Sequence, residues 1–400
     1  MNMQIVILDE HLLADSRINR HIKYMSDHNY DLFRININRS LSCKLSGMKL
    51  DKTIPCYVLG CAYTKISNLN RIFYNIQRFI INNEDFKHIM NQLGISHEIP
   101  TTIHVHDPIL LPCAEKLSHN FHSVKIVYDR HEVYESKRKY FSIISLPAIG
   151  RISEILSTNK IDGVVTVLEE YRCSVEKMFP RSEIAVVPNF PVFDDYDDKI
   201  ILSKIANVSK AKVFQFVYIG SLDWNYDRDI ALIIYLAEEL LSNDYNVRFV
   251  IGGSTTDEKL LSEFTRLKSK YLEKFIYAGY LSRDQAIQYT QESHFGFLLI
   301  KPNTDYWVLT SPNKVFEYLR CGVIPVLRAK CSFKNLLKNN SIWFEREDSK
   351  EQILETIKLI LDDTDRISDQ MIRSYQLSSR FSYESVAHEY VALYESIWGS

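Results

Sequence analysis

Long hydrophobic runs are missing from this sequence. No uninterrupted apolar stretch reaches the ~18 residues that a membrane-spanning helix needs. The first residues, MNMQIVILDEHLLADSR, lack a cationic segment followed by an apolar core, so we expect a first β-strand there and no signal peptide. The seven cysteines are odd in number and include no CxxC pair, which is typical of reduced thiols in a cytosolic protein.

A dominant charge and several nucleotide and nucleophile motifs are missing too. The net charge is −2, which argues against a global field that recruits nucleic acid. No GxGxxG, Walker A or GxSxG motif occurs, so the dinucleotide, P-loop and hydrolase signatures are absent. The acidic pairs Asp194-Asp195 and Asp197-Asp198 do not follow a predicted strand, and we interpret them as solvated.

What is present is an alternation of short apolar runs with longer amphipathic stretches. This pattern is typical of βαβ units and a parallel sheet covered on both faces. A chain of 400 residues favours more than one domain. The alternation stops once, over Pro188–Lys212, where two prolines and an acidic cluster occur, and it restarts at Phe214. We therefore predict an α/β fold of two Rossmann-like, doubly wound domains, with ligands bound outside the carboxyl ends of the strands.

The stretch SPNKVFEYLRCGVIPVL begins at Ser311 and predicts a short helix followed by a buried strand. Ser311 suits the helix cap and Pro312 the first helical position. A helix N-terminus can hold a phosphate, and Lys314 adds a full charge beside it. Glu317, one turn later, could accept hydrogen bonds from the two hydroxyls of a ribose. The alternative is a capped helix whose lysine and glutamate are merely solvated.

A second candidate is IHVHDPILL, in which a strand ends in polar residues. His104 and His106 lie on one face of the predicted strand because side chains alternate. His106 and Asp107 end that strand, where the ligand of a parallel sheet is expected. The alternative is a strand-end turn with the histidine bonded to backbone. Two histidines two residues apart could suggest a metal, but no third ligand follows at a matching spacing, and we predict none.

A third candidate, IVYDRHEVYES, repeats the pattern on the next strand. It ends in the charged residues Asp129, Arg130, His131 and Glu132. Two neighbouring strands that end in titratable side chains predict a site at that edge of the sheet.

Two weaker signals complete the set. Gly220-Ser221 follows the first strand of the second half, where backbone amides could approach a phosphate and Arg228 could pair with it. Asp15-Ser16-Arg17 follows the first strand of the chain, and Arg17 could reach the same edge. The alternatives are an ordinary turn in the first case and a surface capping cluster in the second.

In this order the motifs resemble those of GT-B glycosyltransferases of family 4, in the subgroup that builds bacterial capsule, O-antigen and other surface glycans. The resemblance runs from about Ile5 to Trp398, and the stretch from Ser311 to Tyr318 is its most specific part. The other matching segments are Asp15–Arg17, His106–Pro108, Asp129–Glu132, Val186–Pro191 and Tyr218–Ser221.

The resemblance implies a role for each candidate. Lys314 and Arg228 would meet the donor diphosphate, and Glu317 would hold the ribose. Asn313, Ser311 and the Gly220-Ser221 turn would join the diphosphate contacts, and Tyr280 would lie beside the base. The residues implied on the catalytic and acceptor side are His106, Asp107, His131, Glu132, Asp15 and Arg17.

The resemblance also implies a domain plan and a mechanism. Residues 1–190 would bind the acceptor, 191–212 would link, 213–380 would bind the nucleotide sugar, and 381–400 would form a helix that crosses back to the N-terminal domain. Transfer would proceed with retention from a UDP- or GDP-sugar, across a cleft between the domains. Fixed cations would replace magnesium, so neither a metal nor a cofactor is expected.

The sequence departs from the family pattern at one important position. Many members carry a glutamate seven residues before the one aligned with Glu317, and Leu309 stands there. Contacts to the sugar hydroxyls must therefore differ, and Asn303, Asp305 and Tyr306 are candidates. This departure keeps a non-catalytic nucleotide-sugar-binding partner subunit open, and Asp129, His131 and Glu132 keep open an epimerase of GT-B shape.

Two segments of the first half favour a membrane surface. Asn70–Asn83 mixes arginine with aromatic residues, and Ser136–Arg151 places three cations before an apolar run. The alternative is ordinary helices packed on the sheet. We expect a cytoplasmic protein with peripheral contact at the inner face of the membrane, a glycan or lipid-linked acceptor, and no nucleic-acid partner.

Overall fold

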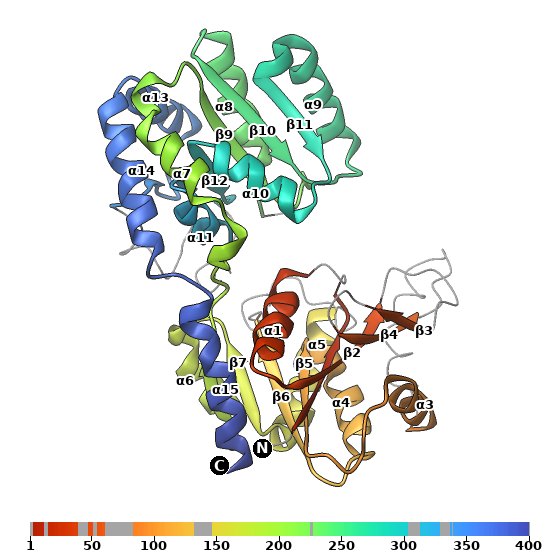
Figure 1. Cartoon of the computed structure of the whole chain (residues 1–400). Helices are drawn as coiled ribbons and strands as arrows, with labels where there is room; N and C mark the ends of the chain where they lie inside the picture. The colour runs from red at the N-terminus through yellow and green to blue at the C-terminus, as the bar shows by residue number, and fades with distance from the viewer. Residues whose placement is uncertain are drawn as a thin grey trace. The chain divides into compact units, whose positions relative to one another are not determined.

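The structure is a computed structural model of the chain, shown in Figure 1, and it divides into two compact units. The first unit holds Met1–Pro188 and Val386–Ser400, and the second holds Asn189–Ser385. The residues that the structure describes are 3–11, 15–38, 47–50, 54–60, 83–131, 146–224, 227–302, 313–328, 337 and 339–399.

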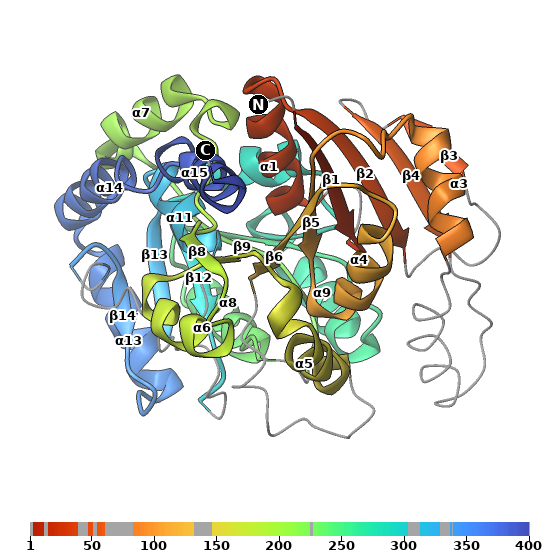
Figure 2. The same ribbon diagram turned by 90° about the horizontal axis from the view of Figure 1, so that it is seen from below.

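The first unit is built on an eight-stranded sheet in the order β3-β4-β2-β1-β5-β6-β7-β8, part of which is visible in Figure 2. Among the described strands, every pair is parallel except the antiparallel pair β3–β4. The strands are β1 (Gln4–Asp9), β2 (Asp31–Asn38), β3 (Gly47–Leu50), β4 (Pro55–Gly60), β5 (Thr101–His106), β6 (Val124–Arg130), β7 (Gly163–Thr166) and β8 (Glu183–Val186). Strands β2, β4 and β3 lie on one side of β1, and β5 to β8 follow in order on the other, so the strand order reverses between β1 and β5.

Helices cover this sheet, and α1 (Ser16–Asp27) illustrates how the sequence begins a helix and buries one of its faces. At its start the carboxylate of Asp15 accepts hydrogen bonds from the backbone N–H groups of Arg17 and Ile18 at 2.9 and 3.1 Å. Ile18, Ile22 and Met25 recur at helical spacing and are buried, so one face packs inward. The other longer helices of this unit are α3 (Asn83–Leu93), α4 (Leu111–Ser118), α5 (Leu146–Ser157), α6 (Arg172–Met178) and α15 (Glu384–Trp398).

The second unit has a six-stranded parallel sheet in the order β11-β10-β9-β12-β13-β14. Its strand order reverses between β9 and β12. Phe216 lies at the centre of the core, with ring centroids 4.9 Å from Phe249 and 4.6 Å from Phe295. The strands are β9 (Phe214–Ile219), β10 (Val247–Gly252), β11 (Phe275–Gly279), β12 (Phe295–Leu299), β13 (Ile324–Arg328) and β14 (Ile342–Phe344). The longer helices are α7 (Asp198–Ala206), α8 (Ile230–Ser242), α9 (Glu258–Tyr271), α10 (Arg283–Glu292), α11 (Asn313–Arg320), α13 (Lys350–Leu361) and α14 (Thr364–Ser378).

These two units confirm the prediction of an α/β fold with two Rossmann-like parallel sheets. Residues 191–212 differ from the expected linker, because they contain α7 and pack within the second unit. Ile201 and Ile205 of α7 are buried in that core. The stretch lacks a strong period because only a few of its side chains face the core. In the part of the chain that the structure describes, no helix is long and apolar enough to cross a membrane.

Candidate functional site

The strand-order reversal of the first unit gathers titratable side chains from three strands. His11 follows β1, Asp107 follows β5, and His131 follows β6. His106 at the end of β5 pairs in register with Asp129 of β6. Because the carboxyl ends of parallel strands meet at one edge of a sheet, these side chains form a single cluster.

Asp129 is the buried centre of this cluster. Arg17 binds its carboxylate with two hydrogen bonds, from Nε at 2.8 Å and from Nη2 at 2.9 Å. Burial alone would raise the pKa of Asp129, but the charge of Arg17 and the neighbouring His104 and His131 hold that pKa well below its usual range. Asp129 is therefore a carboxylate, although it is fully buried. Arg17 also donates to the carbonyl oxygen of Val187 at 3.1 Å.

His106 lies beside this carboxylate and is fully buried. Its Nδ1 is 3.4 Å from Oδ2 of Asp129. Among the described residues, neither of its ring nitrogens has a hydrogen-bond partner. Burial holds the pKa of His106 well below its usual value despite the charge of Asp129, so the ring is neutral near pH 7.

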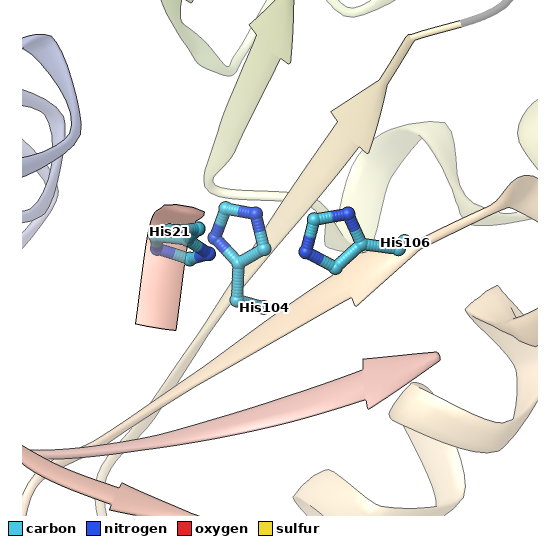
Figure 3. Close-up of side chains that lie close together, drawn as sticks. All are labelled: His21, His104 and His106. Carbon is cyan, nitrogen blue, oxygen red and sulfur yellow. The ribbon is translucent and has the colours of Figure 1, made fainter. Parts of the chain in front are cut away.

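Below this edge the ring of His104 lies between those of His21 and His106, as Figure 3 shows. The hydroxyl of Tyr394 lies 2.9 Å from Nε2 of His21 and 2.7 Å from Nδ1 of His104, so it connects the two rings. Tyr390 stacks on His21 with centroids 4.3 Å apart and donates to Oδ2 of Asp129 at 3.4 Å. Two tyrosines of α15 thus complete the network.

A second group lies at the same edge, where Asp107 contacts two histidines. Nε2 of His11 is 2.6 Å from Oδ2 of Asp107, and Nε2 of His131 is 3.8 Å from Oδ1. Burial would lower the pKa of His11, but the hydrogen bond to Asp107 and the charges of Asp107, Asp15 and Asp9 raise it to about 9. His11 is a functional candidate that was not predicted from the sequence. Its position two residues after the first strand was the available signal.

The other residues predicted in this half have different surroundings. The Asp15 carboxylate caps α1, and Arg17 is buried against Asp129, so the alternative of a capping cluster holds for Asp15 only. Glu132 lies outside the described residues, as does most of Asn70–Asn83 and of Ser136–Arg151.

In the second unit, the backbone is closely packed where β9 and β10 end. The amide of Gly220 donates to the carbonyl of Gly252 at 3.0 Å, and the Tyr218 hydroxyl donates to the carbonyl of Ser221 at 2.7 Å. Gly253 has φ +143°, and a Cβ there would lie 2.2 Å from the carbonyl oxygen of Gly220. Only glycine fits at position 253, so the Gly220-Ser221 turn lies close against the next strand.

Arg228 lies at the strand-order reversal of the second sheet. Its backbone forms an isolated bridge with Ile300, directly after β12. The amides of Asp229 and Lys301 bond to the carbonyls of Leu299 and Asp227, both at 2.8 Å, which fixes this loop against β12. The Arg228 side chain is partly exposed and donates to Asp227 at 3.3 Å.

Helix α11 carries the residues predicted to read phosphate and ribose. Val315, Phe316 and Leu319 are buried, whereas Lys314 and Glu317 are partly exposed. Nζ of Lys314 lies 2.7 Å from Oε2 of Glu317, so the two groups are paired on one face of the helix. Because α11 lies between parallel strands β12 and β13, its N-terminus is at the carboxyl edge of the sheet, the same edge as Arg228.

Tyr280 follows β11 and is 72% exposed, so its ring is free to stack. Asn313 begins α11 in the structure. Ser311 lies outside the described residues, as do Leu309, Asn303, Asp305 and Tyr306.

Comparison with solved structures shows the same fold in several glycosyltransferases. A sucrose-phosphate synthase from Thermosynechococcus elongatus has a TM-score of 0.71 at 11% identity, over 99% of each chain. A trehalose-6-phosphate synthase studied for glycosyltransfer with retention has a TM-score of 0.68 at 13% identity, over 98% of this chain and 99% of that one. An E. coli trehalose-6-phosphate structure bound with UDP-2-fluoro glucose has a TM-score of 0.66 at 12% identity, over 97% of this chain and 98% of that one.

The sequence comparisons concern mainly the second unit. A search of the curated proteins gave no match. Residues 201–376 match the family of Glycosyl transferases group 1, and this range contains β9 to β14 with Arg228, Lys314 and Glu317. The fold of both units and this match agree: the chain has the GT-B fold, and residues 201–376 are similar to the Glycosyl transferases group 1 family.

Proposed function

We propose that the protein is a retaining glycosyltransferase that moves a sugar from a UDP- or GDP-sugar to a glycan or a lipid-linked acceptor. The observation that carries this proposal is the position of the Lys314–Glu317 pair and of Arg228. They lie at the carboxyl edge of the sheet, within the residues that match the Glycosyl transferases group 1 family. The SPNKxFEY stretch supports the family 4 subgroup that makes bacterial capsule, O-antigen and other surface glycans.

In this proposal the second unit holds the donor. Glu317 accepts hydrogen bonds from the ribose hydroxyls, and Tyr280 stacks on the base. Lys314 then turns from Glu317 to the diphosphate, where Arg228 and the N-terminal amides of α11 add positive charge. Ser311, Asn313 and the Gly220-Ser221 turn complete these contacts.

The chemical step needs charge stabilisation more than a nucleophile. The bond between the anomeric carbon and the phosphate oxygen breaks, and its electron pair stays on the diphosphate. The acceptor oxygen bonds the anomeric carbon on the same face, and its proton passes to the departing phosphate oxygen. Lys314, Arg228 and the helix amides stabilise the developing charge, so this step requires neither a metal nor a cofactor from the protein.

The first unit serves the acceptor in this proposal. Neutral His106, with Asp107, His131 and Glu132, orients the transferred sugar and the acceptor hydroxyl. Asp15 and Arg17 act by position, because Asp15 caps α1 and Arg17 binds Asp129. The sugar hydroxyls that a glutamate at the Leu309 position would hold are assigned to Asn303, Asp305 and Tyr306.

A peripheral contact with the inner face of the cytoplasmic membrane is a further part of the proposal. Helix α5 exposes three large apolar side chains, Ile152 at 50%, Ile155 at 59% and Leu156 at 71%. The segment before it carries Lys137, Arg138 and Lys139. Sedimentation with anionic vesicles tests this: binding should weaken in Ile155→Ser/Leu156→Ser, and protein that never sediments at any salt concentration would contradict it.

The donor site is tested by thermal unfolding with UDP, GDP, CMP and their sugars. One nucleotide at 100 times its Kd should stabilise the protein by about 2.7 kcal/mol, seen as a raised midpoint. Glu317→Ala should abolish this rise. Glu355→Ala is the matched control, because Glu355 pairs with Lys358 at the same three-residue spacing and at 2.8 Å. If no nucleotide raises the midpoint, the donor assignment fails.

Two alternative functions can be distinguished from glycosyl transfer by analysing what becomes of the nucleotide sugar. A partner subunit would bind the nucleotide sugar but leave it intact with every acceptor tested, which the Leu309 departure favours. An epimerase would convert the free donor to an epimer without any acceptor, which the cluster of Asp129 and His131 favours.

A further inference from the structure

We propose that His11, Asp107 and His131 form a binding site for a divalent transition-metal ion at the carboxyl edge of the first sheet. Two imidazole nitrogens and one carboxylate would hold the ion. Asp107 and His131 are also proposed for the acceptor side, but this inference does not rest on that proposal, because metal binding can be tested without a sugar substrate.

The ligand atoms of the three side chains are close enough together to bind one ion. One ligand atom from each of the three side chains lies within 4.8 Å of the others. Oδ2 of Asp107 is 2.6 Å from Nε2 of His11, and Oδ1 is 3.8 Å from Nε2 of His131. The carboxylate thus lies between the two Nε2 atoms, and the imidazole rings are 5.5 Å apart. The ion would replace the proton that Nε2 of His11 shares with Asp107, and this proton would be released to solvent. Rotations of the three side chains would bring the ligand atoms to the ~2.0–2.2 Å that such ions require.

The other ring nitrogen, Nδ1, of His11 and of His131 lies near a second carboxylate. Nδ1 of His131 lies 3.7 Å from Oδ1 of Asp129, and Nδ1 of His11 lies 3.8 Å from Oδ2 of Asp15. In metal sites, a ligand histidine commonly donates its other ring N–H to a carboxylate, which fixes the ring and makes the metal-bound nitrogen more basic. Each Nδ1 here has a carboxylate within 3.8 Å, which a rotation of the ring would bring to hydrogen-bond distance, and Arg17 keeps the Asp129 carboxylate ionised.

The backbone of Asp107 adds an independent observation. Its φ is +83° and its ψ is 134°, a combination that non-glycine residues rarely adopt and that is found at functional sites. The side chains of His11, Asp107 and His131 are 29%, 10% and 16% exposed, so an ion could reach them from solvent. A set of two histidines and one carboxylate leaves coordination positions open and suits Fe²⁺, Co²⁺, Mn²⁺ or Zn²⁺.

Two histidine groups that share no residue with this one make weaker sites. In the group of Figure 3, the Tyr394 hydroxyl already bonds to one nitrogen of His21 and one of His104. The group of His97, Glu98 and His122 is more than 60% exposed at every side chain and has no second carboxylate in the described contacts. It is a useful control for binding to surface histidines.

The experiment is a titration of chelator-treated full-length protein with Co²⁺, followed by visible absorption and then by Zn²⁺ competition. The unsubstituted protein and the His122→Ala control should each bind one Co²⁺ at this site with the same affinity. His11→Ala and His131→Ala should lower that affinity at least 10-fold. Asp15→Asn should lower it about 10-fold, because asparagine still caps α1 but no longer offers a carboxylate to His11.

Thermal unfolding of the metal-free variants shows whether each one is folded. If His131→Ala does not fold, the more exposed His11 and the cap-preserving Asp15→Asn still decide the question. The proposal is overturned if the unsubstituted protein binds no Co²⁺, if His11→Ala binds it equally well, or if only His122→Ala loses binding. Nucleotide binding by the second unit should be unchanged in all of these variants, which separates this proposal from the donor assignment.

Discussion

At the scale of single residues, burial decides what Arg17 and Asp129 contribute. Both side chains are almost inaccessible, and their two hydrogen bonds compensate for the loss of hydration. A buried ion pair adds little net stability over apolar residues, but removing one partner leaves an uncompensated charge. We therefore expect Arg17 to stabilise the buried carboxylate of Asp129, around which the histidines lie.

Arg17→Ala should lower the free energy of unfolding by about 3–5 kcal/mol, because Asp129 would remain buried without its cation. Lys87→Ala is the control: Lys87 is exposed and 2.8 Å from Glu84, so about 0–1 kcal/mol is expected. Urea unfolding measures both. Equal, small effects would show that Arg17 is a surface contact and would contradict this account.

His294 makes a second prediction at this scale. Burial, with the charge of Lys204 nearby, lowers the pKa of His294 to about 3. Its Nδ1 accepts a hydrogen bond from the amide of Gln215 at 3.1 Å, which requires the neutral ring. The unfolded chain takes up a proton below pH ~6.5 and the folded protein does not, so stability falls as the pH decreases from there towards 3.

Between pH 7 and 4.5 the unsubstituted protein should lose about 2–3 kcal/mol more than His294→Asn, in which the amide oxygen can accept the same bond without titrating. Denaturant unfolding at several pH values measures the difference. Parallel pH profiles for the two proteins would mean that His294 titrates normally in the folded state.

At the scale of elements, the packing of α11 on the second sheet places Lys314 and Glu317. The ring of Tyr318 covers Gly296 in β12, where a Cβ would lie 2.7 Å from three ring carbons. The Tyr318 hydroxyl donates to the carbonyl of Phe297 at 3.2 Å, and the residue is buried. A side chain at position 296 must therefore displace the Tyr318 ring, through which α11 packs on β12.

Gly296→Ala should destabilise the protein by about 1–3 kcal/mol through overpacking and should also weaken nucleotide binding, since α11 carries the proposed donor contacts. Gly94→Ala is the control, because Gly94 has φ +72° and nothing within 4 Å of its added Cβ. It should lose stability by about 1 kcal/mol through backbone strain alone, with nucleotide binding unchanged. Denaturant unfolding and nucleotide titrations distinguish the two substitutions. Unchanged nucleotide binding in Gly296→Ala would contradict the proposal that α11 contacts the donor.

At the scale of the whole molecule, the end of the chain belongs to the unit in which the chain begins. Residues from Val386 onward group with the first unit. Leu393 packs on Gly163 of β7, with a Cβ at that glycine 3.1 Å from its side chain, and Tyr394 connects His21 with His104. Helix α15 thus completes the core beneath the histidine cluster.

Tyr394→Phe should lower the free energy of unfolding of the first unit by about 1–3 kcal/mol, because two buried histidine nitrogens lose their partner. Tyr280→Phe is the control, since Tyr280 is 72% exposed, and a change within about 0.5 kcal/mol is expected there. Hydrogen exchange of α15 and α1 would report the loss locally. Unchanged exchange in both helices would show that the bridging hydroxyl contributes nothing.

The class of fold and many of the strand ends can be predicted from the amino-acid sequence. The alternation of apolar runs and amphipathic stretches is a local property, and it was enough to predict two parallel-sheet domains and to place His106, Asp107 and His131 at the carboxyl ends of strands. The residues 191–212 were the exception, because α7 has too weak a period to be recognised without its core.

Which of these side chains meet depends on the packing of segments that are distant in the sequence. His11 joins Asp107 and His131 because β1 lies beside β5 and β5 beside β6, an order that no local pattern contains. Tyr394 reaches His21 across 373 positions for the same reason. Side-chain periodicity reports the face that a residue occupies, whereas contact between distant segments depends on how the hydrophobic faces of all elements pack together.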